Sequence, residues 1–341
     1  MGDQQDFLFQ KMFVLRTDED NKTIRIPIDL SYMREATFVE TLDLSGPRLM
    51  MTLDDPDSII RNDIKLRVRD ILEIRIADVE RQVEEDDRGL DQVLHFTIWT
   101  MPNHGNSVKL NCMEYNVDDL KQPAVDSICF TRKPVETILR RLTFGVNYKI
   151  DRFPALEDYH LLPGMRPSKL LRQVAREKGA LCFFRRGSMV FKTLSVMLKQ
   201  EPKFAYEYGN MNARWQITSF VRPNTKSLIR DAAERNVIGW NMTKGLVRSA
   251  MKLASPPEFV NAANLPTLNN LQSMPYPAID FITTGNGSLV PGIPLSLKWH
   301  MSRVDAPLDE SLPSRVVVGT VAHHYRSQKY VCRVKGVLPL L

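Results

Sequence analysis

The six histidines of this sequence are the first residues to consider for metal binding or acid–base chemistry. His323 and His324 are adjacent in a segment with a strand pattern, so their side chains are expected on opposite faces and cannot share a metal there. The other four lie in separate segments without cysteines or carboxylates at ligand spacing: His95, His104, His160 and His300. We therefore assign no metal site.

The four cysteines are widely spaced and form no C-x-x-C motif, which argues against a zinc site or a redox-active pair: Cys112, Cys129, Cys182 and Cys332. Reduced, buried thiols are the expected state. Phosphate-loop and nucleophile-elbow motifs are also absent from the sequence, and Gly285-Asn286-Gly287 lacks the residues that would follow in a phosphate loop. Adjacent carboxylates such as Asp54-Asp55 and Glu157-Asp158 are common in loops. We assign no catalytic or cofactor-binding residue and expect a protein that is not an enzyme.

Charge gives a weak indication of binding partners. The chain has 46 basic and 40 acidic residues, a net charge of +6, and no long basic run. Arg140, Arg141, Arg185 and Arg186 are the arginines that a nucleic-acid-binding module would use, with Phe183-Phe184 beside them for base stacking. A core-facing Phe next to a charged hairpin tip explains the same pattern through the alternation of strand faces. We favour that second interpretation and expect the Arg185-Arg186-Gly187 tip to face solvent or a neighbouring protein.

These residues must be positioned by elements that the sequence marks most clearly between Leu161 and Leu194. Ser168 is a candidate helix cap, apolar residues then recur on one face, and Gly179 suits the left-handed residue that ends a helix. Two short apolar segments around Arg185-Arg186-Gly187-Ser188 predict a β-hairpin. A second helix is predicted to begin at Pro134 and end before Gly145.

The segments on either side of this helix and hairpin are rich in strands. Short alternating segments separated by turn residues fill 7–117 and predict a small antiparallel barrel or sandwich. Strand character returns at Phe204 and continues to Gly336. The segment 243–290 is rich in Pro and Asn and is predicted to be an irregular insertion. No apolar run reaches the roughly 20 residues that a membrane-spanning helix needs, and the N-terminus has no signal-peptide pattern, so we expect assembly in the cytoplasm without membrane insertion.

The sequence resembles the baseplate hub proteins of contractile-tailed phages, a family that includes the late control D proteins and is related to the hub part of type VI secretion spikes. The resemblance spans most of the chain and lies in patterns of hydrophobicity and turns. Five segments carry it: SGPRLMMTLDDPDSII, RVRDILEIRIAD, KPVETILRRLTFG, RPSKLLRQVAREKGALCFFRRGSMVF and VVVGTVAHHYRSQKYVCRVKG.

The resemblance implies an α+β, mostly β fold, with two small antiparallel barrels flanking a middle α/β domain. The implied boundaries are 1–125 for the first barrel, 126–200 for the middle domain and 201–341 for the second barrel. Three subunits would form a homotrimer with a pseudo-sixfold ring that joins the sixfold tail tube to the threefold spike. The implied partners are the tail tube protein, the central spike protein, the baseplate wedge proteins and the tape measure protein, with DNA passing through the lumen unbound. The location would be the tail baseplate of the virion.

Two segments are candidates for contacts between such subunits. The apolar C-terminal segment, with Val337, Leu338, Leu340 and Leu341, could dock on the spike or a neighbour, or simply finish its own barrel. The acidic run Glu84, Glu85, Asp86 and Asp87 could contact a basic partner or form a solvated hairpin tip. A tail-associated cell-wall hydrolase and a nucleic-acid-binding module remain the alternative functions.

Overall fold

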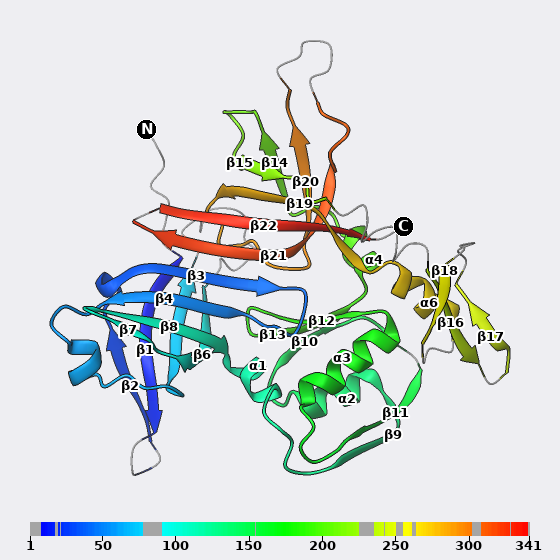
Figure 1. Cartoon of the computed structure of the whole chain (residues 1–341), viewed down its shortest axis with the longest axis horizontal. Helices are drawn as coiled ribbons and strands as arrows, with labels where there is room; N and C mark the ends of the chain where they lie inside the picture. The colour runs from blue at the N-terminus through cyan, green and yellow to red at the C-terminus, as the bar shows by residue number, and fades with distance from the viewer. Residues whose placement is uncertain are drawn as a thin grey trace.

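The computed structural model of the chain describes residues 8–17, 20, 22–77, 91–153, 155–224, 235–241, 243–249, 255–260, 264–301, 308–327 and 329–339. Within them the protein is mostly β and is built on one curved 14-stranded sheet that closes on itself at one end (Figure 1). Smaller sheets and helices pack against it. The mostly β, α+β fold predicted from the sequence is therefore correct.

The N-terminal part of the large sheet has the strand order β2-β1-β5-β6-β8-β4-β3, with every pair antiparallel. Alternate side chains of these strands are buried, as the sequence pattern predicts for a sheet with one core face. A 3-10 turn at Leu30–Tyr32 and a π-helical turn at Ile59–Asp63 connect neighbouring strands. The strands are β1 (Phe9–Thr17), β2 (Thr23–Ile28), β3 (Met33–Thr41), β4 (Arg48–Asp54), β5 (Ile71–Ala77), β6 (Asp91–Thr100), β7 (Asn103–His104) and β8 (Ser107–Glu114).

The C-terminal part of the large sheet is a closed six-stranded barrel. Its order is β21-β20-β14-β15-β19-β22, and β22 pairs again with β21 to close the ring. The sheet continues from the N-terminal part through β3, which pairs antiparallel with β21. The barrel strands are β14 (Phe204–Tyr208), β15 (Gln216–Val221), β19 (Pro275–Thr284), β20 (Pro294–Trp299), β21 (Arg315–Arg326) and β22 (Lys329–Pro339).

One of the two predicted barrels is thus present, with a difference in strand direction. β14 runs parallel to both β15 and β20, so the barrel is mixed and not antiparallel throughout. Alternating burial is the same in parallel and antiparallel pairs, which is why the sequence pattern could not reveal this. In the residues that the structure describes, β2 pairs only with β1, β7 pairs only with β8, and the eight N-terminal strands form an open curved sheet.

The chain between the two parts of the large sheet forms a smaller α/β unit (Figure 1). Two sheets, β10-β13-β12 and β11-β9, pack with the helices around an apolar cluster that contains Ile138, Leu171 and Phe184. The elements are α1 (Tyr115–Leu120), β9 (Ile128–Pro134), α2 (Val135–Leu142), β10 (Asn147–Ile150), β11 (Leu156–Leu161), α3 (Pro167–Lys178), β12 (Leu181–Arg185), β13 (Ser188–Lys192) and α4 (Leu194–Lys199). Both predicted helices and the hairpin are confirmed.

The ends of helix α3 show what the local sequence does and does not determine. Gly179 has φ +60° and ends the helix in the left-handed conformation, as predicted. The predicted Ser168 cap is wrong: Arg166 precedes the helix, Pro167 is its first residue and Ser168 is buried in the first turn. Proline suits that first position because its fixed φ is helical and its missing N–H needs no partner.

The segment 243–290 was predicted to be irregular, and this is wrong for its described residues. They contain β17 (Gly245–Arg248), β18 (Ser255–Phe259), α6 (Leu265–Gln272) and the barrel strand β19. β17 and β18 flank β16 (Arg235–Asn241) in a three-stranded sheet, and α6 packs against this satellite sheet through Leu268. The prolines at 275 and 277 hid a strand whose buried residues, Ile279 and Phe281, alternate normally.

Candidate functional site: a buried polar junction

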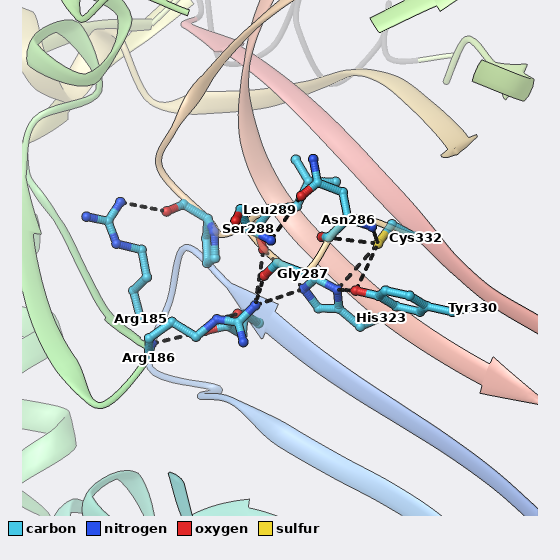
Figure 2. Close-up of polar contacts among 11 residues, drawn as sticks. Arg185, Arg186, Asn286, Gly287, Ser288, Leu289, His323, Tyr330 and Cys332 are labelled. Atoms are coloured by element: carbon cyan, nitrogen blue, oxygen red, sulfur yellow. Dashed lines mark hydrogen bonds and ion pairs between the residues drawn. The ribbon is translucent and has the colours of Figure 1, made fainter. Parts of the chain in front are cut away.

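Three distant parts of the chain meet around a buried ion pair (Figure 2). Glu40 comes from β3, Arg186 from the tip of the β12–β13 hairpin, and the third part is the loop 285–292 with the barrel strands behind it. These residues connect the N-terminal sheet, the α/β unit and the barrel. Any relative movement of the three would have to break this junction.

The hairpin tip has the backbone geometry needed to enter the junction. Arg186 and Gly187 both have positive φ, +49° and +72°, which is the pattern of a tight two-residue hairpin turn whose twist matches the strands. A Cβ atom at Gly187 would lie 3.9 Å from Leu94 of β6, so the tip approaches the N-terminal sheet closely. The turn therefore carries Arg186 inward against the N-terminal sheet.

Arg186 and Glu40 form an ion pair that water scarcely reaches. Their side chains are 5% and 0% exposed, and Arg186 Nε lies 3.0 Å from Glu40 Oε2. That N–H points off the line of a good hydrogen bond, whereas the Arg186 backbone N–H donates to Glu40 Oε1 at 3.1 Å. Burial raises the pKa of Glu40, and the positive charge of Arg186 opposes the rise. The guanidinium also lies 5.1 Å from the centre of the Phe38 ring.

The far end of the guanidinium holds the loop 285–292 through its backbone. Arg186 Nη2 donates to the carbonyl of Gly287 at 2.8 Å and to that of Leu289 at 3.4 Å. The neighbouring Arg185 donates to the carbonyl of Pro291 at 3.3 Å. Two consecutive arginines of the hairpin thus donate hydrogen bonds to carbonyl groups of one loop. These bonds form only when the hairpin and the loop are aligned as they are here, so they fix the position of one against the other.

His323 lies behind Arg186, inside the barrel, and is neutral. Burial, followed by the charge of Arg186, lowers its pKa well below the usual value. Its Nε2 is 3.1 Å from the Leu289 carbonyl and its Nδ1 is 2.7 Å from the Tyr330 hydroxyl. A neutral ring that donates from Nε2 to the carbonyl and accepts the Tyr330 proton at Nδ1 satisfies both contacts. The ring also stacks on Phe38, with ring centres 5.8 Å apart.

Cys332, His323 and Asn286 are residue types found together in cysteine hydrolases, and Cys332 Sγ lies 3.3 Å from His323 Nδ1. Their exposed fractions are 0%, 1% and 2%, so no substrate can reach them. The Tyr330 hydroxyl already occupies His323 Nδ1, and the Asn286 amide donates to Tyr206 at 2.9 Å. The cluster supports packing of the barrel and not nucleophilic chemistry.

The predicted solvent-facing hairpin tip is therefore wrong for Arg186, which is buried. Arg140, by contrast, is exposed, pairs with Glu136 at 2.7 Å and stacks on Tyr148. Arg186 cannot join Arg140 and Arg141 in one nucleic-acid-binding surface. The sequence separation of 146 residues between Arg186 and Glu40 explains why local patterns did not reveal the pair.

The other residues singled out from the sequence lie mostly apart from the junction. His323 is buried whereas His324 bonds Thr37 at 2.8 Å, as expected for adjacent residues of a strand. Three of the free cysteines are buried as predicted, but Cys129 is exposed. The described part of the chain contains no group of three His, Cys, Asp or Glu side chains arranged to hold a metal ion. Of its helices, none has the length and apolar character that a transmembrane span requires.

Val337 and Leu338 belong to strand β22. Val337 is 9% exposed and packs with Phe183 and Val317, and Leu338 pairs with Tyr276 of β19. Leu340 and Leu341 lie outside the described residues, as do Glu84, Glu85, Asp86 and Asp87. The interface role of these residues stays a prediction.

The combination of a closed six-stranded barrel, an eight-stranded sheet continuous with it and a helix-and-hairpin unit between them defines a class of protein by fold. It is the fold of phage tail proteins and of a type VI secretion component. A scan of protein-family models and a search of curated proteins find no match. The fold is thus the feature that relates this chain to known proteins.

Three solved structures illustrate the likeness. A tail protein from Neisseria meningitidis MC58 has a TM-score of 0.63 at 10% identity, with 96% of each chain covered. The 43 kDa tail protein of prophage MuSo2 from Shewanella oneidensis has a TM-score of 0.58 at 10% identity, covering 96% of this chain and 98% of the other. A component of the Escherichia coli type VI secretion system has a TM-score of 0.50 at 10% identity, covering 90% and 73%.

Proposed function

We propose that this protein is the structural hub of a contractile phage tail baseplate. The supporting observation is that its whole described fold, and not one module, matches tail proteins over 96% of both chains. The virion tail is the location that this proposal implies.

In this proposal three subunits form a ring that adapts the sixfold tail tube to the threefold spike. The N-terminal sheet and the barrel lie side by side in one continuous sheet, so three subunits would present six β modules around the axis. The division into 1–125, 126–200 and 201–341 fits this arrangement, with the first unit completing a second barrel in the assembly. The edge of β2 is open to pairing with another chain in the described residues.

The buried junction supplies the rigidity that such an adapter needs. Glu40 and Arg186 tie the N-terminal sheet to the α/β unit, and Arg186 also ties that unit to the barrel loop. A ring that transmits force between tube and spike must keep its modules in fixed relation. The proposed neighbours are the tail tube, central spike, wedge and tape measure proteins, and DNA passes through the lumen without specific binding.

Mass photometry of the purified protein, alone and with its cognate spike, tests the proposal. We expect a species of three times the chain mass, alone or on addition of the spike. A protein that stays monomeric under both conditions would refute it. Cell-wall degradation or tight, salt-dependent binding to duplex DNA would instead favour the hydrolase or nucleic-acid alternatives.

A further inference from the structure

Three cations converge on the turn that joins β3 to β4. Arg48 Nε donates to the carbonyl of Ser45 at 3.1 Å, and Lys121 Nζ donates to the same carbonyl at 3.4 Å. Arg172 Nη2 donates to the neighbouring carbonyl of Leu44 at 3.5 Å. The three side chains come from the start of β4, the C-cap of α1 and the middle of α3. We call Arg48, Lys121 and Arg172 the cation cluster.

The turn beneath the cation cluster is held in one position. Gly46 has φ +85°, and a Cβ atom there would lie 2.6 Å from Val117 of α1, so the turn packs directly against that helix. The carboxylate of Asp43 accepts hydrogen bonds from the Thr41 hydroxyl and from the Ser45 backbone N–H, both at 2.8 Å. The carbonyl groups that orient the three cations are therefore fixed before any ligand arrives.

The positive charge of the cation cluster is not neutralised within the described part of the chain. None of its three side chains has a carboxylate oxygen within 4.0 Å there. Asp43 and Asp118 are the carboxylates whose charge reaches Lys121, and Asp118 already pairs with Arg69 at 3.0 Å. Burial, followed by repulsion from the two arginines of the cluster, lowers the pKa of Lys121 to about 8. Lys121 is thus still protonated at neutral pH, and three cations face one remaining carboxylate.

Most hydrogen-bond donors of the cation cluster are left for a ligand. A guanidinium has five N–H groups in a planar fork that fits a carboxylate, and Arg48 and Arg172 each use one of these groups in the contacts described above. Both arginines are exposed. Repulsion among the three cations is relieved when an anion binds between them. The cluster therefore combines fixed positions, accessible donors and uncompensated charge.

We propose that the cation cluster binds an acidic segment of a partner protein, whose carboxylates accept hydrogen bonds from Arg48 and Arg172. Because Arg48 belongs to the N-terminal sheet and Arg172 to the α/β unit, the bound segment would connect these two parts of the molecule. The inference goes beyond the proposed function, and it depends neither on the trimer nor on which tail protein supplies the acidic segment.

Charge favours an acidic protein over two other occupants. Each copy of this chain carries a net charge of +6, so a second copy is repelled at long range, whereas an acidic partner is attracted. Nucleic acid is bound by stripes of cations that follow the phosphates. This cluster is instead compact, and the turn and helix that carry it also carry the exposed acids Asp43 and Asp119.

Fluorescence anisotropy of a labelled hexaglutamate peptide, added to the full chain, tests the inference. We expect saturable binding that weakens about tenfold when the salt concentration rises from about 50 to about 500 mM. R48M, K121M and R172M should each weaken it about threefold to tenfold, and the triple variant should show no measurable binding. R48K keeps the charge and should bind almost as tightly as the unmodified protein.

K109M is the matched control, because Lys109 is an exposed cation of β8 that also has no ion pair in the described residues. It removes the same charge from the molecule but not from the cation cluster, so its affinity for hexaglutamate should be unchanged. Circular dichroism should show that every variant is folded, as expected for substitutions at side chains that the core does not enclose.

Four outcomes would refute the inference. Hexaglutamate may fail to bind the unmodified protein saturably, or it may bind the triple variant equally well. A single-stranded oligonucleotide that binds more tightly than hexaglutamate, and loses affinity in the same variants, would make nucleic acid the ligand. A peptide with the sequence of Glu84 to Asp87 that binds more tightly than hexaglutamate would make a second copy the occupant. Absence of a trimer would refute the hub proposal alone and leave this inference intact.

Discussion

Replacing Arg186 with methionine tests the buried junction most directly. Methionine keeps an unbranched apolar stem but is shorter than arginine, and it removes the cation that faces Glu40, a carboxylate with 0% of its side chain exposed. Removing one partner of a buried ion pair costs about 3–5 kcal/mol, because the remaining charge has neither water nor a partner. The carbonyls of Gly287 and Leu289 lose donors as well. We expect R186M to lower the free energy of unfolding by about 4 kcal/mol, a large part of the roughly 5–15 kcal/mol of a typical domain.

A second substitution at Glu40 separates the cost of an unpaired charge from a simple loss of packing. In the double variant E40L/R186M both charged groups are gone, and such replacements are neutral or stabilising by about 1–4 kcal/mol relative to the intact pair. We therefore expect the double variant to recover most of the stability that R186M loses. R140M is the matched control, because Arg140 and Glu136 form an exposed pair one helical turn apart. Its effect should stay below about 1.5 kcal/mol, the sum of an exposed ion pair and the stacking of Arg140 on Tyr148.

Guanidinium unfolding followed by circular dichroism and tryptophan fluorescence measures these differences. Coincident transitions from the two probes would validate a two-state comparison, and in their absence the midpoints are compared for each probe. An R186M midpoint equal to that of R140M would refute the reasoning. So would an E40L/R186M variant no more stable than R186M, since the loss would then reside in contacts other than the buried charge.

Three further predictions concern single groups. Burial raises the pKa of Glu114 to about 7, so the stability that this group contributes is fully present below pH 4.5 and is lost as the pH rises to 7. Urea unfolding at pH 5 and pH 8 should show that E114Q removes up to about 3 kcal/mol of this pH dependence. An E114Q variant whose unfolding free energy changes with pH as much as that of the unmodified protein would contradict the prediction. Hydrogen bonds from Asn210 and His300 lower the pKa of Glu207 to about 2, so the stability that this group contributes should be lost as the pH falls from 4.5 to 2. In acid unfolding, E207Q should therefore lose less stability over that range than the unmodified protein does. Cys129 alone should react quickly with a thiol reagent in the folded protein, because the other three thiols are buried; more than one fast thiol would show that the core opens.

The sequence predicted those elements whose signals are local. Helix α3 ends at Gly179 because a left-handed residue is needed there, and the β12–β13 hairpin turns at Arg186-Gly187 because both residues adopt positive φ. Such requirements are met within a few residues and are visible in one sequence. Alternating burial in β3 and β5 was visible for the same reason.

Features that depend on distant partners could not be predicted in this way. Arg186 looks like a polar hairpin tip until Glu40, 146 residues away, is placed beside it. The direction of β14 could not be predicted either, because its parallel partners are segments distant in the chain. Strand β19 was missed because its prolines lie at its first residues, although Ile279 and Phe281 further along are buried in the barrel. The Cys332, His323 and Asn286 cluster gave no signal because its members belong to different strands and a loop.

The pairing of β3 with β21 also bears on how the protein is made. Thr37 and His324, which bond across this pair, are 287 residues apart in the chain. At a synthesis rate of roughly 5–20 residues per second, β3 emerges from the ribosome roughly 15–60 s before its partner exists. During that interval one edge of the nascent sheet is open to other nascent chains. Slow translation or high expression should therefore favour aggregation of N-terminal fragments, and a chaperone that covers strand edges should raise the yield of folded protein.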